Sequence, residues 1–316
     1  MKIGIVGAGA MGGLFGGMLT RAGQDVWLID NHKERAEKIN SEGLVIEASE
    51  TREAREPKKR VVRIKVTTEP GQVGPCNLVI LFVKAYDTEE AARNSLPLRG
   101  TKTVWLTLQN GLGNIEKMGK IVGEDRVIGG ITYQGATVLE MGRIRHAGYG
   151  KTVIGEIGGK RSERIEYVSD IFNQAGIDTE ISDNIEGMLW SKLLINAAIN
   201  PLTAITRVRN GQLLESPLLR ETMKLIVEEA TQVPLKKGIE LPYPGVFETV
   251  EESCYASRDN ISSMLQDILR KKRTEIDFIN GALVSEAEKI GIRTPLNRAL
   301  WNLVKFLEEG REYDVK

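Results

Sequence analysis

The chain begins with the stretch that decides its fold, Ile3-Gly4-Ile5-Val6 followed directly by Gly7-Ala8-Gly9-Ala10-Met11-Gly12. The first four residues predict a strand that is buried on both faces, as in a parallel sheet. Gly7, Gly9 and Gly12 have the G-x-G-x-x-G spacing that permits a sharp turn, the approach of backbone to a pyrophosphate and the packing of the next helix. We therefore expect this turn to bind a dinucleotide at the N-terminus of a helix, where free N–H groups face the phosphates.

A second apolar stretch, Val26–Ile29, predicts the next strand, and Asp30 ends it about 20 residues after the glycines. A carboxylate at this point can bind an adenosine ribose, which favours NADH. Asn31 follows and joins the expected cofactor-binding residues. Lys33 or Arg35 could instead meet the 2′-phosphate of NADPH, so both cofactors stay open. A glycine-rich turn without a ligand is the alternative, but strand, glycines, helix, strand and acid all occur in order.

Length and composition bound the class of protein. At 316 residues the chain is long for one hydrophobic core, so two domains are expected. The 43 basic residues balance the 43 acidic ones, which favours neither nucleic acid nor a membrane as partner. No apolar run is long enough to span a bilayer, and the first strand begins at once, so we expect no signal peptide. Cys76 and Cys254 form no disulfide or metal pattern, which indicates a cytoplasmic protein without a metal.

Two further predicted strands end in polar residues. Asn77–Val83 is followed by Lys84, and Thr103–Leu108 is followed by a turn that contains Asn110 and Gly111. Alone, such a turn would most often have no further role. Ligands bind at the carboxyl ends of strands in open α/β sheets, so we expect Lys84 and Asn110 to face the cofactor together with the glycines.

The remaining segments divide the chain. Further strands are expected at Gly43–Ala48, Val61–Val66, Val127–Thr132, Gln134–Leu139, Ile144–His146 and Lys151–Glu156, the last four closing the sheet through antiparallel connections. The charge-dense stretch Thr51–Arg60 predicts an exposed turn. From Asn184 onward strand signals vanish and helical periods dominate. We therefore predict an α/β fold, with a Rossmann-type dinucleotide-binding domain at residues 1–182 and an all-helical domain for substrate binding and dimerisation at residues 183–316.

The most informative stretch after the glycines is Glu186–Pro201. Lys192, Asn196 and Asn200 are spaced four residues apart, which places them on one face of a helix, about 6 Å apart at each step. Most residues between them are apolar, and burying a polar side chain without a partner is costly. The stripe is therefore expected to face a substrate. An internal hydrogen-bond network, with Lys192 reaching out to water, is the alternative.

Two later stretches, Asn260–Asp267 and Arg270–Gly281, carry less information by themselves. Composition alone predicts a solvated amphipathic helix here, because a run of charges is usually an exposed face.

Together these blocks resemble the ketopantoate reductase family over essentially the whole chain. The resemblance is carried by Gly7–Gly12, Val83-Lys84-Ala85, Asn110-Gly111-Leu112-Gly113, Trp190-Ser191-Lys192-Leu193 with Asn196, Asn200-Pro201-Leu202-Thr203-Ala204, Asn260-Ile261-Ser262-Ser263-Met264 and Thr274-Glu275-Ile276-Asp277-Phe278-Ile279-Asn280-Gly281. Many dehydrogenases share the glycine turn, whereas the last two blocks are much more specific.

The resemblance implies an NAD(P)H-dependent oxidoreductase that reduces 2-oxopantoate (ketopantoate) to (R)-pantoate on the way to pantothenate and coenzyme A. It implies catalytic roles for Lys192 and for Glu275, which would bind the substrate hydroxyl. Substrate-binding roles are implied for Asn110, Lys192, Asn196, Asn200, Asn260, Ser263 and Glu275, and a place near the nicotinamide for Lys84 and Asn110. Family members specific for NADPH often carry arginine where this chain has Asp30-Asn31, so NADPH and NADH both remain candidates, with Asp30 favouring NADH.

The residue types suit this chemistry. Negative charge develops on the ketone oxygen as hydride arrives, and the Lys192 ammonium can stabilise that charge and donate the proton. Ser263 and Glu275 would lie about 18 Å apart on an unbroken helix. If both contact one small substrate, the chain must turn between them, near Arg270–Arg273.

Two other functions fit part of the pattern. A related 2-oxo-acid or 3-hydroxy-acid dehydrogenase would also place a lysine and an asparagine on a helix after a Rossmann domain, but the two C-terminal blocks argue against it. A non-catalytic dinucleotide-sensing protein would have no reason to keep Lys192 and Glu275 together. We further expect a homodimer formed through the helical domain, with 2-oxopantoate as its small-molecule partner.

Overall fold

A computed structural model describes residues 1–48 and 59–310. The chain divides into two compact units, the first formed by residues 1–109 and 114–185, the second by residues 110–113 and those from Glu186 onward. Most of the turn predicted at Thr51–Arg60, residues 51–58, lies outside the described residues. The predicted boundary at 182/183 and the observed division at 185/186 differ slightly, and the binding and dimerisation roles of the two parts remain predictions.

The first unit is built on a mostly parallel sheet. Among the described residues this sheet has eight strands in the order β12-β11-β8-β7-β6-β1-β2-β5. Their bounds are β1 (Lys2–Val6), β2 (Asp25–Ile29), β5 (Lys65–Thr67), β6 (Cys76–Leu81), β7 (Arg99–Thr107), β8 (Val127–Thr132), β11 (Thr152–Glu156) and β12 (Thr179–Ile181). Neighbouring strands are parallel except β8 and β11. The predicted α/β fold class is confirmed.

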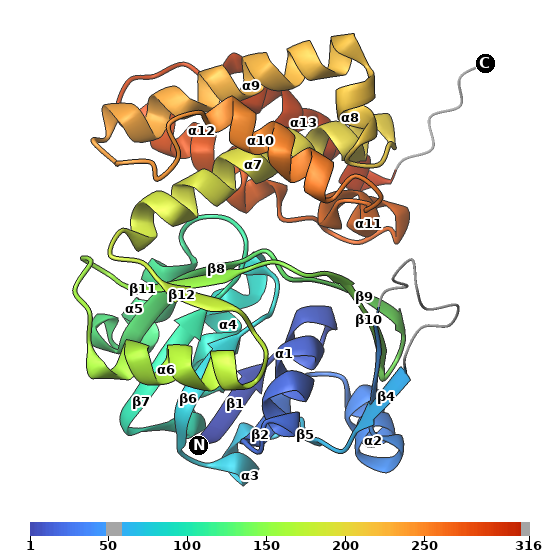
Figure 1. Ribbon diagram of the computed structural model, residues 1–316, viewed down its shortest axis with the longest axis vertical. Helices are drawn as coiled ribbons and strands as arrows, with labels where there is room; N and C mark the ends of the chain where they lie inside the picture. The colour runs from blue at the N-terminus through green and yellow to red at the C-terminus, as the bar shows by residue number, and fades with distance from the viewer. Residues whose placement is uncertain (49–58, 311–316) are drawn as a thin grey trace. The chain divides into compact units, whose positions relative to one another are not determined.

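Helices cover both faces of this sheet (Figure 1), which explains why β1, β6 and β8 are almost wholly buried. One face packs against α1 (Ala10–Arg21), α2 (Lys33–Glu42) and α6 (Glu163–Gln174), and the other against α3 (Pro70–Val73), α4 (Thr88–Asn94) and α5 (Asn114–Val122). Short 3-10 turns form η1 (Ala85–Asp87), η2 (Leu96–Leu98) and η3 (Glu124–Arg126).

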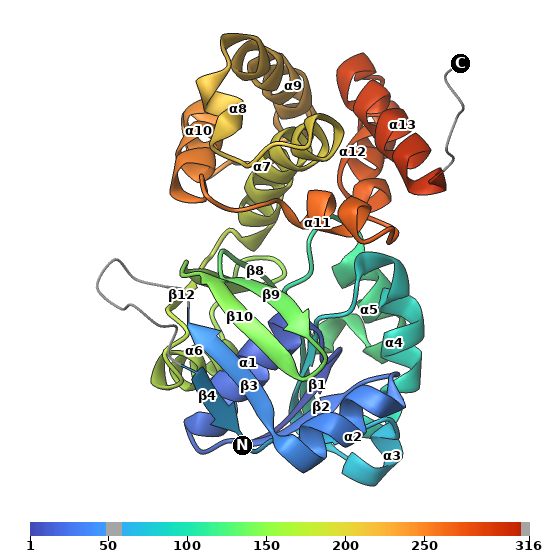
Figure 2. The same cartoon turned by 90° about the vertical axis from the view of Figure 1, so that its right-hand side faces the viewer.

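A second sheet packs against α1 (Figure 2). Among the described residues it has four strands in the order β4-β3-β10-β9, with the bounds β3 (Leu44–Ala48), β4 (Lys59–Val62), β9 (Gly135–Glu140) and β10 (Arg143–Gly148). The prediction that the strands at 134–139 and 144–146 close the main sheet is therefore wrong. The strand predicted at 61–66 is also wrong, since its residues are shared between β4 and β5, which lie in different sheets.

Glycines on α1 explain how two sheets can approach one helix. A Cβ on Gly16 would lie 2.7 Å from the Leu28 side chain of the main sheet. A Cβ on Gly17 would lie 2.4 Å from the Ile46 side chain of the second sheet. Because contacts this short do not occur between real side chains, both positions require glycine unless the neighbours shift.

Among the described residues, every secondary-structure element of the second unit is a helix. Its elements are α7 (Ile185–Thr206, whose first residue belongs to the first unit), α8 (Gln212–Glu215), α9 (Pro217–Lys236), α10 (Val246–Ala256), α11 (Ser263–Leu269), η4 (Ile276–Phe278), α12 (Asn280–Lys289) and α13 (Pro295–Glu309). Leu193, Leu194 and Ala197 on α7 are buried against side chains of α9, α11, α12 and α13. Across residues 1–48 and 59–310, no helix is both long enough and apolar enough to span a bilayer.

The chain turns between α11 and η4, as the distance between Ser263 and Glu275 predicted. The helix ends at Leu269, and Lys271 has a left-handed backbone with φ of 54°. The solvated helix expected from the composition of Arg270–Gly281 is therefore wrong. The charge of Asp277 in this stretch is in fact held by α13, where Lys305 binds it at 3.2 Å and Trp301 Nε1 donates to it at 2.8 Å.

Candidate active site

The glycine turn between β1 and α1 is shaped by its backbone. Gly7 has a φ of 101°, and a Cβ there would lie 3.0 Å from the Val83 nitrogen. A Cβ on Gly12 would lie 1.8 Å from the Gly7 carbonyl oxygen, so the helix could not pack onto the turn with a larger residue. Gly9, the N-cap of α1, has open space where its Cβ would be. A ligand can therefore approach the backbone at Gly9, while the other two glycines serve packing.

Asp30 holds this turn from the end of β2. It is 5% exposed, and its Oδ2 accepts a hydrogen bond from the Ala8 N–H at 2.9 Å. Its Oδ1 accepts from the His32 N–H at 2.8 Å, and the Arg35 guanidinium donates to Oδ2 at 2.7 Å. The Asp30 carboxylate thus fixes both the glycine turn and Arg35, while Asn31 is exposed.

These residues fit a nicotinamide dinucleotide. No side chain among the described residues caps the N-terminus of α1, whose N–H groups and partial positive charge suit a pyrophosphate. β1 lies between β2 and β6, so the winding of the sheet reverses there, and ligands bind outside the carboxyl ends of strands at such a point. Within residues 1–48 and 59–310, no group of three or more His, Cys, Asp or Glu side chains could hold a metal ion.

Gln109 ties together the loops that follow β6 and β7. Its Nε2 donates to the Val83 carbonyl at 2.7 Å and to Thr88 Oγ1 at 2.9 Å. Its Oε1 accepts from Thr107 Oγ1 at 2.9 Å. Lys84 follows Val83 directly and is half-buried, so this network fixes the backbone that carries Lys84.

The loop after β7 belongs to the helical unit. The Leu112 N–H donates to the Phe278 carbonyl at 3.0 Å. Gly111 has a φ of 85°, and a Cβ there would lie 2.5 Å from the same oxygen, so only glycine permits this approach. Asn110 is thereby brought to α7, where Asn196 Nδ2 donates to its Oδ1 in a long hydrogen bond of 3.5 Å.

Lys192 lies on α7 in surroundings that disfavour its charge. Burial lowers the pKa of the Lys192 ammonium to about 8, and the negative charge of Glu275 acts in the opposite direction. At neutral pH the ammonium is still mostly protonated. Asn200, on the same helix, is 6% exposed.

Glu275 is buried directly before η4 and is held in place through its neighbours. The Glu308 carboxylate of α13 accepts hydrogen bonds from the Thr274 N–H at 2.7 Å and from Thr274 Oγ1 at 2.6 Å. The Ile276 N–H donates to Thr274 Oγ1 at 3.1 Å. α13 thus anchors the backbone that presents Glu275 to Lys192.

The segment at residues 260–263 is connected to α7 through Ser262, the residue directly before the predicted Ser263. Ser262 is buried and caps α11, and Thr203 Oγ1 of α7 donates to its Oγ at 2.7 Å. Ser263 is exposed in the first turn of α11, and Asn260 is half-buried, its carbonyl accepting from the Asn210 N–H at 3.1 Å. The segment that carries Asn260 and Ser263 is therefore tied to the helix that carries Lys192.

Comparison with known proteins identifies this arrangement. The family model described as "Ketopantoate reductase PanE/ApbA" matches residues 3–159, and the model of its C-terminal part matches residues 184–308. The chain belongs to the ketopantoate reductase family. This is a family of nicotinamide-dependent oxidoreductases that act on CH–OH groups.

Individual members of the family and solved structures agree with this assignment. The 2-dehydropantoate 2-reductase of Pyrococcus horikoshii is 40% identical over 312 residues, which cover 98% of each chain. A PanE/ApbA family ketopantoate reductase from Ralstonia eutropha is 33% identical with a TM-score of 0.88, covering 98% of this chain and 99% of the other. D-mandelate dehydrogenase, solved with NADH and anilino(oxo)acetate, is 29% identical with a TM-score of 0.90, and the match covers 98% of this chain and 99% of the other.

In this member of the ketopantoate reductase family, the predicted site residues fall into two groups. In the helical unit Asn110 is bonded to Asn196, and Glu275 acts on Lys192 through its charge. Gly7–Gly12 and Asp30 form the glycine turn of the first unit. The sequence interpretation missed Gln109, Ser262 and Glu308, which hold backbone that carries predicted site residues. Gln109 alone had a signal, since it is polar and sits between an apolar strand and the Asn110 turn.

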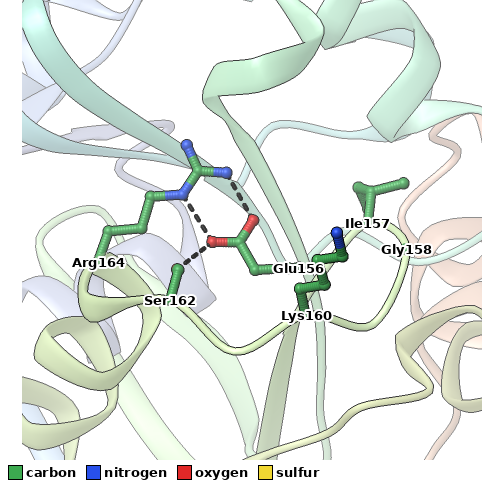
Figure 3. A pocket seen from close by; sticks show the side chains of 6 residues that line it. All are labelled: Glu156, Ile157, Gly158, Lys160, Ser162 and Arg164. Carbon is green, nitrogen blue, oxygen red and sulfur yellow. Dashed lines mark hydrogen bonds and ion pairs between the residues drawn. The ribbon is translucent and has the colours of Figure 1, made fainter.

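A hollow in the first unit contains none of the predicted residues of this reductase family member (Figure 3). At its wall, Arg164 donates to Glu156 through Nε at 2.7 Å and through a second nitrogen at 2.5 Å, and Ser162 donates to the same carboxylate. Burial raises the pKa of Glu156, but the hydrogen bonds from Arg164 and Ser162 outweigh burial and leave the pKa below its ordinary value. The hydrogen bonds between these side chains join β11 to α6, so we assign them a structural role.

Proposed function

We propose that this chain is a 2-dehydropantoate 2-reductase that reduces the ketone of 2-oxopantoate to give (R)-pantoate. The observation that carries the proposal is the half-buried Lys192 ammonium on an apolar helix, whose pKa is lowered to about 8 by desolvation near the charge of the buried Glu275. Asn196, one helical turn after Lys192, is bonded to Asn110, and both offer uncharged hydrogen-bonding groups. An acid, a carboxylate and two amides are the groups that a hydroxylated 2-oxo acid requires.

Lys192 is the proposed general acid. A bound nicotinamide cofactor supplies the hydride. The ammonium stabilises the negative charge that forms on the ketone oxygen and then transfers its proton to that oxygen. A pKa of about 8 suits this role, because the group is charged at neutral pH and yet gives up its proton readily. Solvent returns the proton to Lys192 after product release.

The charges of the site orient the proposed substrate. Glu275 would repel the substrate carboxylate and accept a hydrogen bond from its hydroxyl group. The carboxylate is then left to the uncharged side chains of Asn200, Asn260 and Ser263, with Asn110 and Asn196 near the reacting carbon. This orientation predicts that 2-oxo acids without the hydroxyl group lose binding at Glu275 first.

The cofactor is proposed to lie on Gly7–Gly12, with its ribose toward Asp30 and Asn31 and its nicotinamide toward Lys84 and Asn110. Open space at Gly9 and the uncapped α1 N-terminus support this placement. Arg35 is bound to Asp30 at 2.7 Å, so a 2′-phosphate would compete with the carboxylate for it. We therefore propose NADH as the preferred cofactor. Fluorescence titration with NADH and NADPH measures the preference directly, and Asp30→Ala is expected to shift it toward NADPH.

The test of the function is the oxidation of NADH and of NADPH, followed by nicotinamide absorbance, with 2-oxopantoate as substrate. Turnover with either cofactor supports the reductase. Tight cofactor binding without turnover on any oxo acid would instead favour a dinucleotide-sensing protein.

A second candidate is the reduction of an aromatic 2-oxo acid. It is favoured by the likeness to D-mandelate dehydrogenase, which was solved with NADH and an anilino-substituted oxo acid. The two candidates differ in the hydroxyl group that Glu275 would bind. Phenylglyoxylate, 2-oxopantoate and a panel of 3-hydroxy acids, compared by kcat/KM, separate them.

We further propose that the enzyme works as a cytoplasmic homodimer in pantothenate and coenzyme A biosynthesis. Exposed apolar side chains on α13, Leu296, Leu303 and Phe306, recur at helical spacing and support a subunit contact through the helical unit. Cys76 and Cys254 are both buried free thiols, which suits a reducing compartment. Light scattering of the purified protein measures the oligomeric state.

A further inference from the structure

Helix α7 contains a proline at a position where the helix needs a hydrogen-bond donor. Pro201 lies inside α7 and has no N–H group. The carbonyl of Ala197, four residues earlier, therefore has no helical donor. Both residues are buried, so solvent does not easily take the place of that donor.

Asn280, on a different helix, supplies this donor. Its Nδ2 donates to the Ala197 carbonyl at 3.0 Å and to Asn297 Oδ1, also at 3.0 Å. The side chain is 0% exposed, and among the described residues its Oδ1 has no hydrogen-bond partner. An amide that stays in the core with an unpartnered oxygen contributes through its donors, because an apolar side chain would avoid that cost.

The bond from Asn280 falls between the two halves of the polar stripe. Lys192 and Asn196 precede Ala197 on the helix, whereas Asn200 follows it. A proline removes one hydrogen bond and pushes on the carbonyl four residues before it, so a helix bends at such a place. An outside donor on that carbonyl sets the direction of the second half relative to the first.

The donor is itself held firmly. Asn297 Nδ2 donates to Glu229 Oε1 at 2.9 Å, and Glu229 also accepts from the Asn297 N–H at 2.8 Å. These bonds join α12 and α13 to α9, which packs in the same core as α7. Asn280 thus connects the break in α7 to three other helices.

We propose that Asn280 is a positioning residue, which replaces the hydrogen bond that Pro201 cannot make and so fixes Asn200 relative to Lys192. The consequence for the reaction rests on the proposed function of the α7 stripe. Asn280 contacts neither substrate nor cofactor in this proposal. It acts only through the backbone of Ala197.

A double-mutant cycle tests this proposal, because Pro201→Ala restores the N–H that the helix lacks. The cycle compares the unchanged chain with Asn280→Leu, Pro201→Ala and the double variant. Asn280→Leu is expected to raise KM for 2-oxopantoate about tenfold, since a buried carbonyl loses its donor and Asn200 moves. In the double variant the N–H restored at position 201 bonds the Ala197 carbonyl, and KM is expected to return to within about threefold of the unchanged value.

A purely structural role predicts a different result. Asn280→Leu would then lower the midpoint of thermal unfolding and leave KM unchanged, or it would raise KM in a way that Pro201→Ala does not reverse. Either result overturns the proposal. If Asn280→Leu does not accumulate as folded protein, recovery of soluble, folded protein in the double variant serves as the same test.

Asn297→Leu is the matched control, because the hydrogen bonds of Asn297 in the same network run to α9 and α12. It is expected to lower the unfolding midpoint, and Pro201→Ala is expected not to rescue it; equal rescue of both variants overturns the proposal. The coupling between positions 280 and 201 is also measured in urea unfolding, without substrate. If the unchanged chain does not reduce 2-oxopantoate but the coupling is present, the proposed function has failed and the tie between Asn280 and α7 has not.

Discussion

The glycine turn of the first unit and the polar stripe of the helical unit are built on opposite principles. At the glycine turn the working parts are backbone, and two of its glycines are required because a Cβ would meet backbone atoms 3.0 Å or less away. On α7 the groups that we propose to act are side chains, whose surroundings come from residues 110–113, α11, η4 and α13. A site made of backbone depends on local sequence, whereas a site made of side chains depends on the whole unit around it.

The largest expected effect tests whether the stripe truly depends on one side chain. Lys192→Ala and the nearly isosteric Lys192→Met are expected to lower kcat by about 10²–10⁴-fold, because the general acid is lost. Steady-state kinetics measure this, with the unfolding midpoint as the check on the fold. Lys160→Ala, an exposed lysine at the wall of the hollow in the first unit, is the control and should keep full activity. Near-normal turnover of Lys192→Met would remove the general-acid role.

A pair of substitutions tests the glycine turn. Gly12→Ala places a Cβ 1.8 Å from the Gly7 oxygen and is expected to cost about 3 kcal/mol or more of stability. Gly9→Ala meets no atom within 4 Å, so it should fold normally and instead lose about tenfold in NADH affinity, because its methyl group occupies the space left for the pyrophosphate. Unfolding midpoints and fluorescence titrations measure both variants. If Gly9→Ala binds NADH as well as the unchanged chain, the ligand does not lie where we place it.

A stability experiment tests how far the second site depends on distant segments. Glu308→Ala leaves the buried N–H and hydroxyl of Thr274 without their acceptor and is expected to cost about 1–3 kcal/mol. Asn302→Ala, at an exposed position of the same helix, is expected to change stability by less than about 0.5 kcal/mol. Urea unfolding compares the two. Equal stability of both variants would mean that α13 does not anchor the Glu275 segment.

The smallest expected effect concerns pH. The alkaline limb of kcat/KM is expected to have its midpoint at about 8, because the proposed general acid Lys192 would have to be protonated and its pKa is about 8. Glu275 raises the pKa of Lys192, so Glu275→Gln removes that influence and should move the limb to lower pH. The shift of the midpoint is the readout, since the substitution also weakens substrate binding. A limb that moves to higher pH would show that Glu275 does not act on Lys192 through its charge.

The same contrast explains which features could be predicted from the sequence. The spacing of Gly7, Gly9 and Gly12 carries its own geometric reason, and the resemblance to a known family supplied the turn between Ser263 and Glu275. The second sheet was missed because Gly16 and Gly17 look like part of an ordinary apolar helix. The need for a small residue at these two positions arises from Leu28 and Ile46, which pack there from two different sheets.

The residues that hold the site through hydrogen bonds, such as Glu308 and Asn280, could not be predicted from sequence spacing. Glu308 stands beside Glu309 at the end of a helix, and nothing near it in the sequence shows that it accepts two hydrogen bonds from Thr274. Asn280 was part of a recognised motif, but its link to Pro201 appears only when α7 and α12 are seen side by side. Long-range hydrogen bonds of this kind leave no periodicity or spacing in the sequence.

The loop at residues 110–113 has a consequence for how such a gene can recombine. A single crossover at 185/186 between two relatives would leave the loop with one parent and the helical unit with the other. Gly111 and Leu112 of the first parent would then have to fit Phe278 of the second, although the two positions lie far apart in the gene. Exchange of helical units between members of this family is therefore expected to succeed only when residues 110–113 are inherited together with them, so the unit of exchange is discontinuous in the DNA.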